Sequence, residues 1–196
     1  MAEGALSRRA PETIVTARLR LRRPAAADAD AIFTTYASDP DVTRYVGWPR
    51  HTGVEQTRAF VDFADAQWRD WPAGPYLILL RDGPIVGGTG LAFDDRRQAQ
   101  TGYVLATRVW GRGYATEALQ AMADLARDLG VRRLYAICHV DHAASARVLE
   151  KCGFVREARL PRYAEFPNLV PGEPQDVLRY STIVEFHGGT SEGNAA

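Results

Sequence analysis

A glycine-containing loop, Arg108-Val-Trp-Gly-Arg-Gly113, leads directly into the most regular amphipathic segment of the chain. Between Tyr114 and Leu129 apolar residues recur three and four positions apart, which predicts a helix with one buried face. The apolar run just before the loop, residues 102–106, is typical of a strand. A strand, a tight turn and a helix in this order favour a fold in which helices pack on a sheet.

Apolar patterning along the rest of the chain extends this α/β interpretation. Asp82-Gly83 separates two apolar runs and indicates a β-hairpin. We predict one α/β (α+β) domain over residues 14–186, a mixed sheet of about seven strands flanked by helices, between flexible termini at 1–13 and 187–196. Strands are expected at 16–23, 76–81, 85–93, 102–106, 134–140, 155–160 and 177–186, and helices at 27–38, 54–71, 114–129 and 143–152.

Composition excludes several classes of protein. The 196 residues include 24 basic and 24 acidic side chains, which argues against a general binder of nucleic acid or membrane surfaces. Two cysteines, Cys138 and Cys152, are too few for a disulfide scaffold and favour the cytoplasm. No apolar run is long enough to span a membrane, and residues 1–10 lack the apolar core of a signal peptide.

The loop itself suggests an anion site. Gly111 and Gly113 would let a ligand approach the main chain, and the amides at a helix start attract negative charge, so a pyrophosphate fits. Arg108 and Arg112 add positive charge at the same place. Two glycines can also serve only as a tight turn. A dinucleotide fingerprint is disfavoured, because Thr116 occupies the position of its third glycine.

Arg108-x-x-Gly111-x-Gly113 resembles the acetyl-coenzyme A motif of the GNAT acetyltransferase superfamily. Other segments resemble the RimJ/RimL branch of that superfamily and follow its order along the chain. They are Thr16–Arg22, Gly102–Leu105, Gly113–Leu119 and Ser145–Phe154.

The resemblance implies a sheet splayed at its centre, between residues 102–106 and 134–140, with acetyl-coenzyme A bound in the opening. Main-chain groups around Val104, Leu105 and Ala106 would pair with the pantetheine arm as an added strand would. His142 stands where the family usually has an asparagine that contacts the pantetheine. The expected pyrophosphate contacts are the amides of Gly111, Arg112, Gly113, Ala115 and Thr116, with Arg108 beside them.

Acetyl transfer to an amine needs an acceptor for the amine proton, and a proton or hydrogen bond for the departing thiolate. The tyrosine that many family members use for the thiolate is replaced by Leu149. Ser145 lies one helical turn earlier on the same face and matches a serine of the RimJ/RimL branch, so the resemblance implies that Ser145 takes this role and also contacts the cofactor. A helix-capping role for Ser145 is equally compatible with the sequence. Glu165 resembles an acidic residue that follows the sixth strand in that branch, so the resemblance implies that it is the base, with Glu117 and Asp176 as alternatives. The resemblance places Trp48 in the acceptor-binding wall.

The segment Cys138-His139-x-x-His142 contains three side chains that could bind a metal, but neighbouring strand residues point to opposite faces, and we expect no metal site. The resemblance implies an acetyl-coenzyme A-dependent N-acetyltransferase acting on a small-molecule amine or a protein N-terminus, by direct attack in a ternary complex. The replacements at Leu149 and His142 leave open a non-catalytic acyl-coenzyme A-binding module. The exposed aromatic loop around Trp48 could also serve a homodimer interface.

Overall fold

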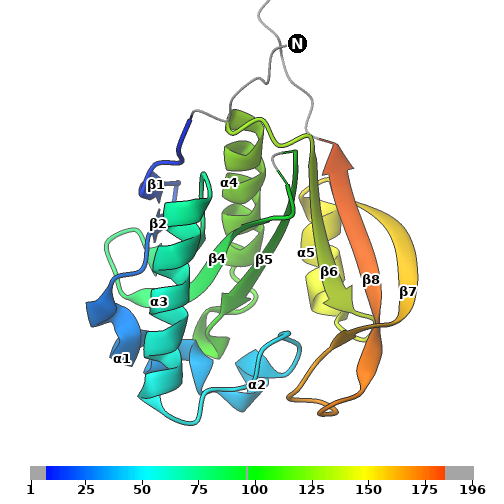
Figure 1. The fold of residues 1–196 in the computed structure, drawn as a ribbon, viewed down its shortest axis with the longest axis horizontal. Coiled ribbons are helices and arrows are strands. Elements are labelled where there is room, and N and C mark those ends of the chain that lie inside the picture. Colours follow the sequence, from blue (N-terminus) through cyan, green and yellow to red (C-terminus); the bar gives the residue numbers. More distant parts are fainter. Residues whose placement is uncertain (1–7, 96, 184–196) are drawn as a thin grey trace, which may run out of the picture.

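The computed structural model describes residues 8–95 and 97–183. An eight-stranded mixed sheet runs through them in the order β1-β2-β3-β4-β5-β6-β8-β7 (Figure 1). Neighbouring strands are antiparallel except β5 and β6, which are parallel. The strands are β1 (Thr13–Val15), β2 (Leu19–Arg22), β3 (Pro75–Leu80), β4 (Ile85–Phe93), β5 (Gln98–Leu105), β6 (Arg133–His139), β7 (Val155–Glu165) and β8 (Pro174–Ile183).

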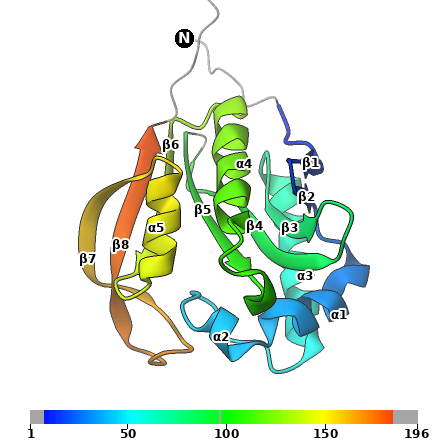
Figure 2. The same cartoon turned by 180° about the vertical axis from the view of Figure 1, so that it is seen from behind.

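Helices cover the two faces of the sheet. The helix α3 lies on one face against the first half of the sheet, and α4 and α5 lie on the opposite face (Figures 1 and 2). Most of the core lies between the sheet and α4, whose apolar stripe includes the fully buried Leu119 and Met122. The helical elements are η1 (Ala26–Asp28), α1 (Ala29–Ile32), η2 (Phe33–Ala37), α2 (Pro40–Thr43), α3 (Val54–Asp70), η3 (Thr107–Val109), α4 (Tyr114–Asp128) and α5 (Ala143–Lys151).

The sheet opens between β5 and β6. These strands pair only at Gln98, Ala99 and Gln100, which face Arg133, Leu134 and Tyr135, and then they diverge. Figure 1 shows them separating toward the end of the molecule where α2 lies. The predicted mixed α/β fold with a central splay is therefore confirmed.

The elements differ from the expectations in several places. The short strand β1 brings the number of strands to eight, and β5 begins at Gln98, inside a stretch expected to be a turn. The helix α2 was not among the expected helices and starts at Pro40, because the side chain of Asp39 accepts hydrogen bonds from the amides of Asp41 and Val42. The last strand was expected to reach residue 186, and residues 184–186 lie outside the described part of the chain.

The segment before β1 is anchored to the domain. The amide of Ala10 donates to the carbonyl of Pro72 at 2.8 Å, and the phenol of Tyr76 donates to the carbonyl of Pro11 at 2.7 Å. The expected flexible N-terminus therefore does not include these two residues. No helix within the described residues is long and apolar enough to cross a membrane.

Candidate active site

A cavity of about 620 Å³ occupies the opening between β5 and β6. Its walls are β5, β6, the glycine loop with the start of α4, the start of α5, and the segment around α2. Eight of the predicted site residues line it: Val104, Leu105, Gly111, Gly113, Ala115, Thr116, His142 and Ser145.

A larger groove, of about 820 Å³, lies between the N-terminal segment and the outer face of α4. Of the predicted site residues, only Gly113 and Thr116 line this groove as well. Neither Ser145 nor His142 reaches it. The opening between β5 and β6 is therefore the place where the predicted chemistry comes together.

The glycine loop presents main-chain amides to the cavity. Gly111 and Gly113 have φ angles of +73° and +79°, in the left-handed region where glycine is favoured. Gly113 begins α4, and no side chain from the described residues caps this helix start. The first amides of a helix have no partner within the helix. A 15-residue helix that begins with open amides therefore fits a pyrophosphate group.

Neither arginine of the loop lines this cavity. The guanidinium of Arg108 donates to the carbonyl of Ile85 at 3.0 Å and does not line the cavity. This bond satisfies a carbonyl at the start of β4, and the contact of Arg108 with a phosphate stays a prediction. Arg112 is exposed, and its carbonyl accepts a hydrogen bond from Arg18 at 2.9 Å.

The edge of β5 that faces the opening has lost its partner strand beyond Gln100. Val104 and Leu105 lie on this stretch and line the cavity, and the carbonyl of Leu105 already accepts a hydrogen bond from the indole of Trp110 at 2.7 Å. The pairing of this stretch with an extended pantetheine arm stays a prediction. Ala106 differs, because its amide donates to the carbonyl of Val86 at 2.8 Å and is directed toward β4. Its side chain is buried.

Ser145 lies in the first turn of α5, and its hydroxyl is 3.1 Å from the phenol of Tyr103 on β5. The amide of Ser145 donates to the carbonyl of His142, but the Ser145 hydroxyl makes no cap at this helix start. Leu149, one turn further, is fully buried in the core. The hydroxyl of Ser145 is therefore directed to the cleft and not to the capping role that the sequence left open.

His142 closes the cavity together with Tyr45, which follows α2. Their rings stack with centroids 4.6 Å apart, and Tyr45 also contacts the ring of His139 at 5.2 Å. Burial, and to a lesser extent the neighbouring His139, lower the pKa of His142. A neutral imidazole at this position can donate one hydrogen bond and accept one.

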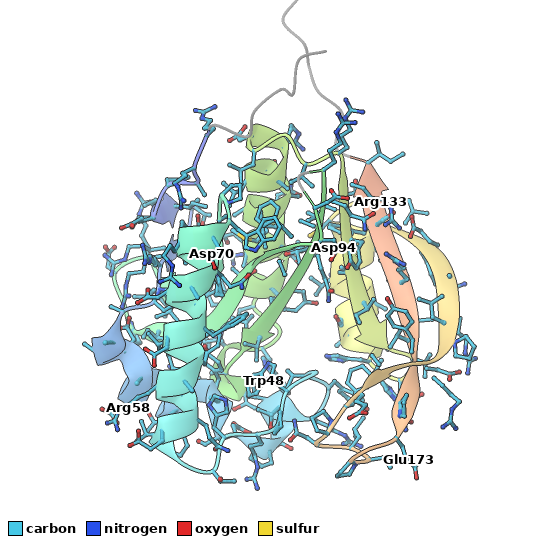
Figure 3. The ribbon with its side chains drawn as sticks, in the orientation of Figure 1. Trp48, Arg58, Asp70, Asp94, Arg133 and Glu173 are labelled. Atoms are coloured by element: carbon cyan, nitrogen blue, oxygen red, sulfur yellow. The ribbon has the colours of Figure 1, made fainter. Side chains whose placement is uncertain are left out.

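Glu165 and Trp48 do not line the cavity. Glu165 ends β7 and is exposed, while Trp48 lies in the connection between α2 and α3. Figure 3 shows Trp48 at the α2 end of the molecule, where β5 and β6 stand furthest apart. The two alternative bases are engaged elsewhere. Glu117 binds Thr16 and Arg18, and Asp176 binds Arg159 and the amide of Arg162.

Asn168 holds the Trp48 connection in place. Its side-chain amide donates to the carbonyls of Thr43 and Trp48 at 2.7 and 2.9 Å, and its side-chain oxygen accepts from the amide of Arg50 at 2.8 Å. These three bonds join the β7–β8 connection to the α2–α3 connection.

Several residues of the cleft were not among the predicted site residues. Those that line the cavity are Tyr45, Tyr103, Arg147 and Lys151, and Asn168 lies beside it. Only the Gly-Tyr pair ahead of the glycine loop, and the spacing of four between Arg147 and Lys151 on one helix, could have indicated any of these residues. Within the described ranges, no group of three histidine, cysteine, aspartate or glutamate side chains is arranged to hold a metal ion.

Comparison with known proteins identifies the family. A family model described as an acetyltransferase (GNAT) domain matches residues 18–155. The chain is 32% identical over 173 residues to the N-acetyltransferase YoaA of Bacillus subtilis, covering 86% of this chain and 94% of YoaA. It is 29% identical over 182 residues to the N-acetyltransferase p20 of Bacillus licheniformis, covering 91% of this chain and 99% of p20.

Solved structures agree with this assignment. A GNAT-family acetyltransferase from Bacillus anthracis has a TM-score of 0.75 at 26% identity, covering 89% of this chain and 99% of its own. The ribosomal L7/L12 α-N-protein acetyltransferase RimL, in complex with coenzyme A, has a TM-score of 0.75 at 26% identity, covering 87% and 97%. The chain therefore belongs to the GNAT acetyltransferase family, in its RimJ/RimL-like branch, and is an N-acetyltransferase.

Proposed function

We propose that this protein transfers the acetyl group of acetyl-coenzyme A to a primary amine, of a small molecule or of a protein N-terminus, by direct attack in a ternary complex. The observation that carries the proposal is the single cleft that joins the open amides of the glycine loop to the hydroxyl of Ser145. RimL, which shares the fold, acts on the N-terminus of a ribosomal protein and holds coenzyme A in its structure.

Acetyl-coenzyme A is the acyl donor, in agreement with the sequence-based prediction. When bound, it supplies an activated thioester and a thiol leaving group. The residues present fit it: the amides of Gly111, Gly113, Ala115 and Thr116 would hold the pyrophosphate, and the edge of β5 would pair with the pantetheine. Arg147 and Lys151, on the cavity side of α5, would add positive charge for the phosphates.

Two side chains carry the proposed proton chemistry. Ser145 would donate a hydrogen bond to the sulfur of the leaving group, because its hydroxyl lies in the cleft and takes no part in capping α5. Glu165 would accept the proton of the amine, directly or through water, from the rim beside the Trp48 connection. The position of Glu165 next to this connection supports the proposal, since the main-chain carbonyl oxygen of Glu165 is the nearest atom to a Cβ placed at Gly47, at 3.9 Å.

Trp48 would form part of the acceptor wall, and His142 would contact the pantetheine with one ring nitrogen. Both proposals rest on position: His142 lines the cavity, and Trp48 is held beside it by Asn168. The cytoplasmic location inferred from the cysteine content also stays a prediction, as does a homodimer through the Trp48 loop.

The experiment that tests the function is release of free thiol from acetyl-coenzyme A with a panel of small amines and N-terminal peptides. We expect release that depends on one class of amine and saturates with its concentration. A protein that binds acetyl-coenzyme A but releases thiol with none of the amines would instead be the non-catalytic binding module that the replacement at Leu149 left open.

A further inference from the structure

A serine hydroxyl helps a leaving group only if its hydrogen points the right way, and a free hydroxyl rotates. The hydroxyl of Ser145 has one side-chain partner among the described residues, the phenol of Tyr103 at 3.1 Å. The same phenol is 3.5 Å from the main-chain carbonyl of Ser145. Tyr103 is thus the group that can set the direction of the Ser145 hydroxyl.

Tyr103 belongs to the opposite wall of the cleft. It lies on β5, three residues beyond the last pair with β6, and lines the cavity that Ser145 lines from α5. In Figure 2, α4 and α5 lie on the same face of the sheet. The contact between Tyr103 and Ser145 therefore joins two walls of the cleft, β5 and α5.

The phenol keeps its proton throughout the neutral range. Burial raises the pKa of Tyr103 to about 12, and the bond with Ser145 lowers it only in part. Two oxygen atoms of Ser145 are candidate acceptors for the phenolic hydrogen. The Ser145 hydroxyl at 3.1 Å is close to the usual range for such bonds, while the carbonyl at 3.5 Å is well beyond it.

We propose that Tyr103 is a positioning residue, which donates its phenolic hydrogen to the hydroxyl oxygen of Ser145 and so turns the hydrogen of that hydroxyl toward the sulfur of the leaving group. The inference rests on the proposed function and deepens it. It also bears on Leu149: α5 carries no phenol at that position, and β5 brings one to Ser145, one helix turn earlier. The phenol is neither consumed nor ionised, so no bond on the enzyme is made or broken.

Tyr103→Phe tests this role, because phenylalanine keeps the packed ring and removes the hydroxyl. We expect kcat for thiol release to fall by roughly tenfold or more. The dissociation constant for acetyl-coenzyme A, measured by calorimetry, should change by less than about twofold, since the phenol acts on a hydroxyl and not on the coenzyme. An unchanged kcat would overturn the proposal.

Tyr180→Phe is the matched control. Tyr103 is half-buried and Tyr180 is buried, and the phenol of Tyr180 likewise bonds a residue of α5, Glu150 at 3.0 Å, but Tyr180 does not line the cavity. We expect this variant to keep kcat within about twofold. A similar fall in kcat for both variants would show that Tyr103 only supports α5, and would overturn the positioning role.

A double-variant cycle separates action through Ser145 from independent action. If Tyr103 acts by orienting the hydroxyl, Ser145→Ala combined with Tyr103→Phe should be no slower than Ser145→Ala alone. Effects of the two substitutions that multiply would mean that the phenol acts by itself, which contradicts the inference.

A further measurement uses the protein without any ligand. With tyrosine labelled at Cζ by carbon-13, the signal that Tyr103→Phe removes should move in Ser145→Ala, while the signal removed by Tyr180→Phe should stay. An unmoved Tyr103 signal would refute the hydrogen bond. If the bond is present but the wild-type protein releases no thiol with any amine, the proposed function fails, and the role of Tyr103 in turnover fails with it.

Discussion

Gly113 begins α4 with a left-handed backbone, and this single residue joins the geometry of the loop to its chemistry. A Cβ placed there would meet only the guanidinium of Arg18, at 3.4 Å. Space is therefore not the main constraint. The main constraint is the φ angle of +79°, because a residue with a Cβ adopts this region at a cost of about 1–2 kcal/mol.

We predict that Gly113→Val lowers the affinity for acetyl-coenzyme A by at least about tenfold, since the strained backbone would turn the first amides of α4 away from the cleft. Titration calorimetry measures the change. Gly53→Ala is the control, because Gly53 has an extended backbone and open space around its Cβ position. Undiminished affinity in Gly113→Val would remove the loop from the phosphate site.

At the scale of elements, the start of α4 is tied to the strand region near the N-terminus. The carboxylate of Glu117 accepts hydrogen bonds from the hydroxyl of Thr16 at 2.6 Å and from the amide and side chain of Arg18 at 2.8 and 2.6 Å. Arg18 also donates to the carbonyl of Arg112 in the glycine loop. Burial raises the pKa of Glu117, but these hydrogen bonds lower it more, so its pKa lies below 4.5 in the folded protein.

We predict that Glu117→Ala lowers the free energy of unfolding at pH 7 by about 1–2 kcal/mol. The folded-state pKa is depressed, so this contribution is complete above the unfolded pKa and is lost as the pH falls through the folded pKa. Urea unfolding at pH 7 and at pH 3 should therefore show a smaller difference between variant and wild type at pH 3. Glu55→Ala removes an exposed partner of Arg58 and should change stability by less than about 0.5 kcal/mol at either pH. A difference for Glu117→Ala that does not shrink at pH 3 would contradict the assignment to the carboxylate.

The two connections beside the cleft form a second pair of linked elements, joined by Asn168. We predict that Asn168→Ala lowers kcat/KM for the amine severalfold and leaves the affinity for acetyl-coenzyme A unchanged, because it releases the Trp48 connection but not the glycine loop. Gln175→Ala is the control, since Gln175 bonds only to the carbonyl of Glu173 within its own hairpin. If kcat/KM for the amine and the affinity for acetyl-coenzyme A fell equally, Asn168 would contribute to overall stability and not to the acceptor side of the site.

At the scale of the whole molecule, the two halves of the sheet are joined by three residue pairs between β5 and β6 and by the packing of α4 and α5. A coenzyme in the opening would touch both halves. We predict that acetyl-coenzyme A at about 100 times its dissociation constant adds about 2.7 kcal/mol of stability, which raises the melting temperature by about 5–10 °C. NADH at the same concentration should not raise it, and a rise with NADH alone would overturn the choice of cofactor.

Much of the fold and part of the site could be predicted from the sequence, because local patterns specify them. The apolar spacing of residues 114–129 reflects the periodicity of a helix, and the loop from Arg108 to Gly113 contains the glycines that its positive φ angles require. The order of the strands and helices could be predicted from apolar patterns in the same way. Local patterns were less informative where a short polar side chain changes the backbone, as Asp39 does at the start of α2.

Only the tertiary structure decided which side chains meet. Tyr103 and Ser145 are 42 positions apart, and Asn168 and Trp48 are 120 apart, so no window of sequence contains either contact. In the structure, the guanidinium of Arg108 likewise bonds a carbonyl of β4, and Glu165 is exposed outside the cavity. Sequence by itself determined most of the elements and the glycines of the cofactor loop, because apolar periodicity and positive φ angles are local properties. The cleft and its chemistry follow from the divergence of β5 and β6, which depends on packing across the whole sheet.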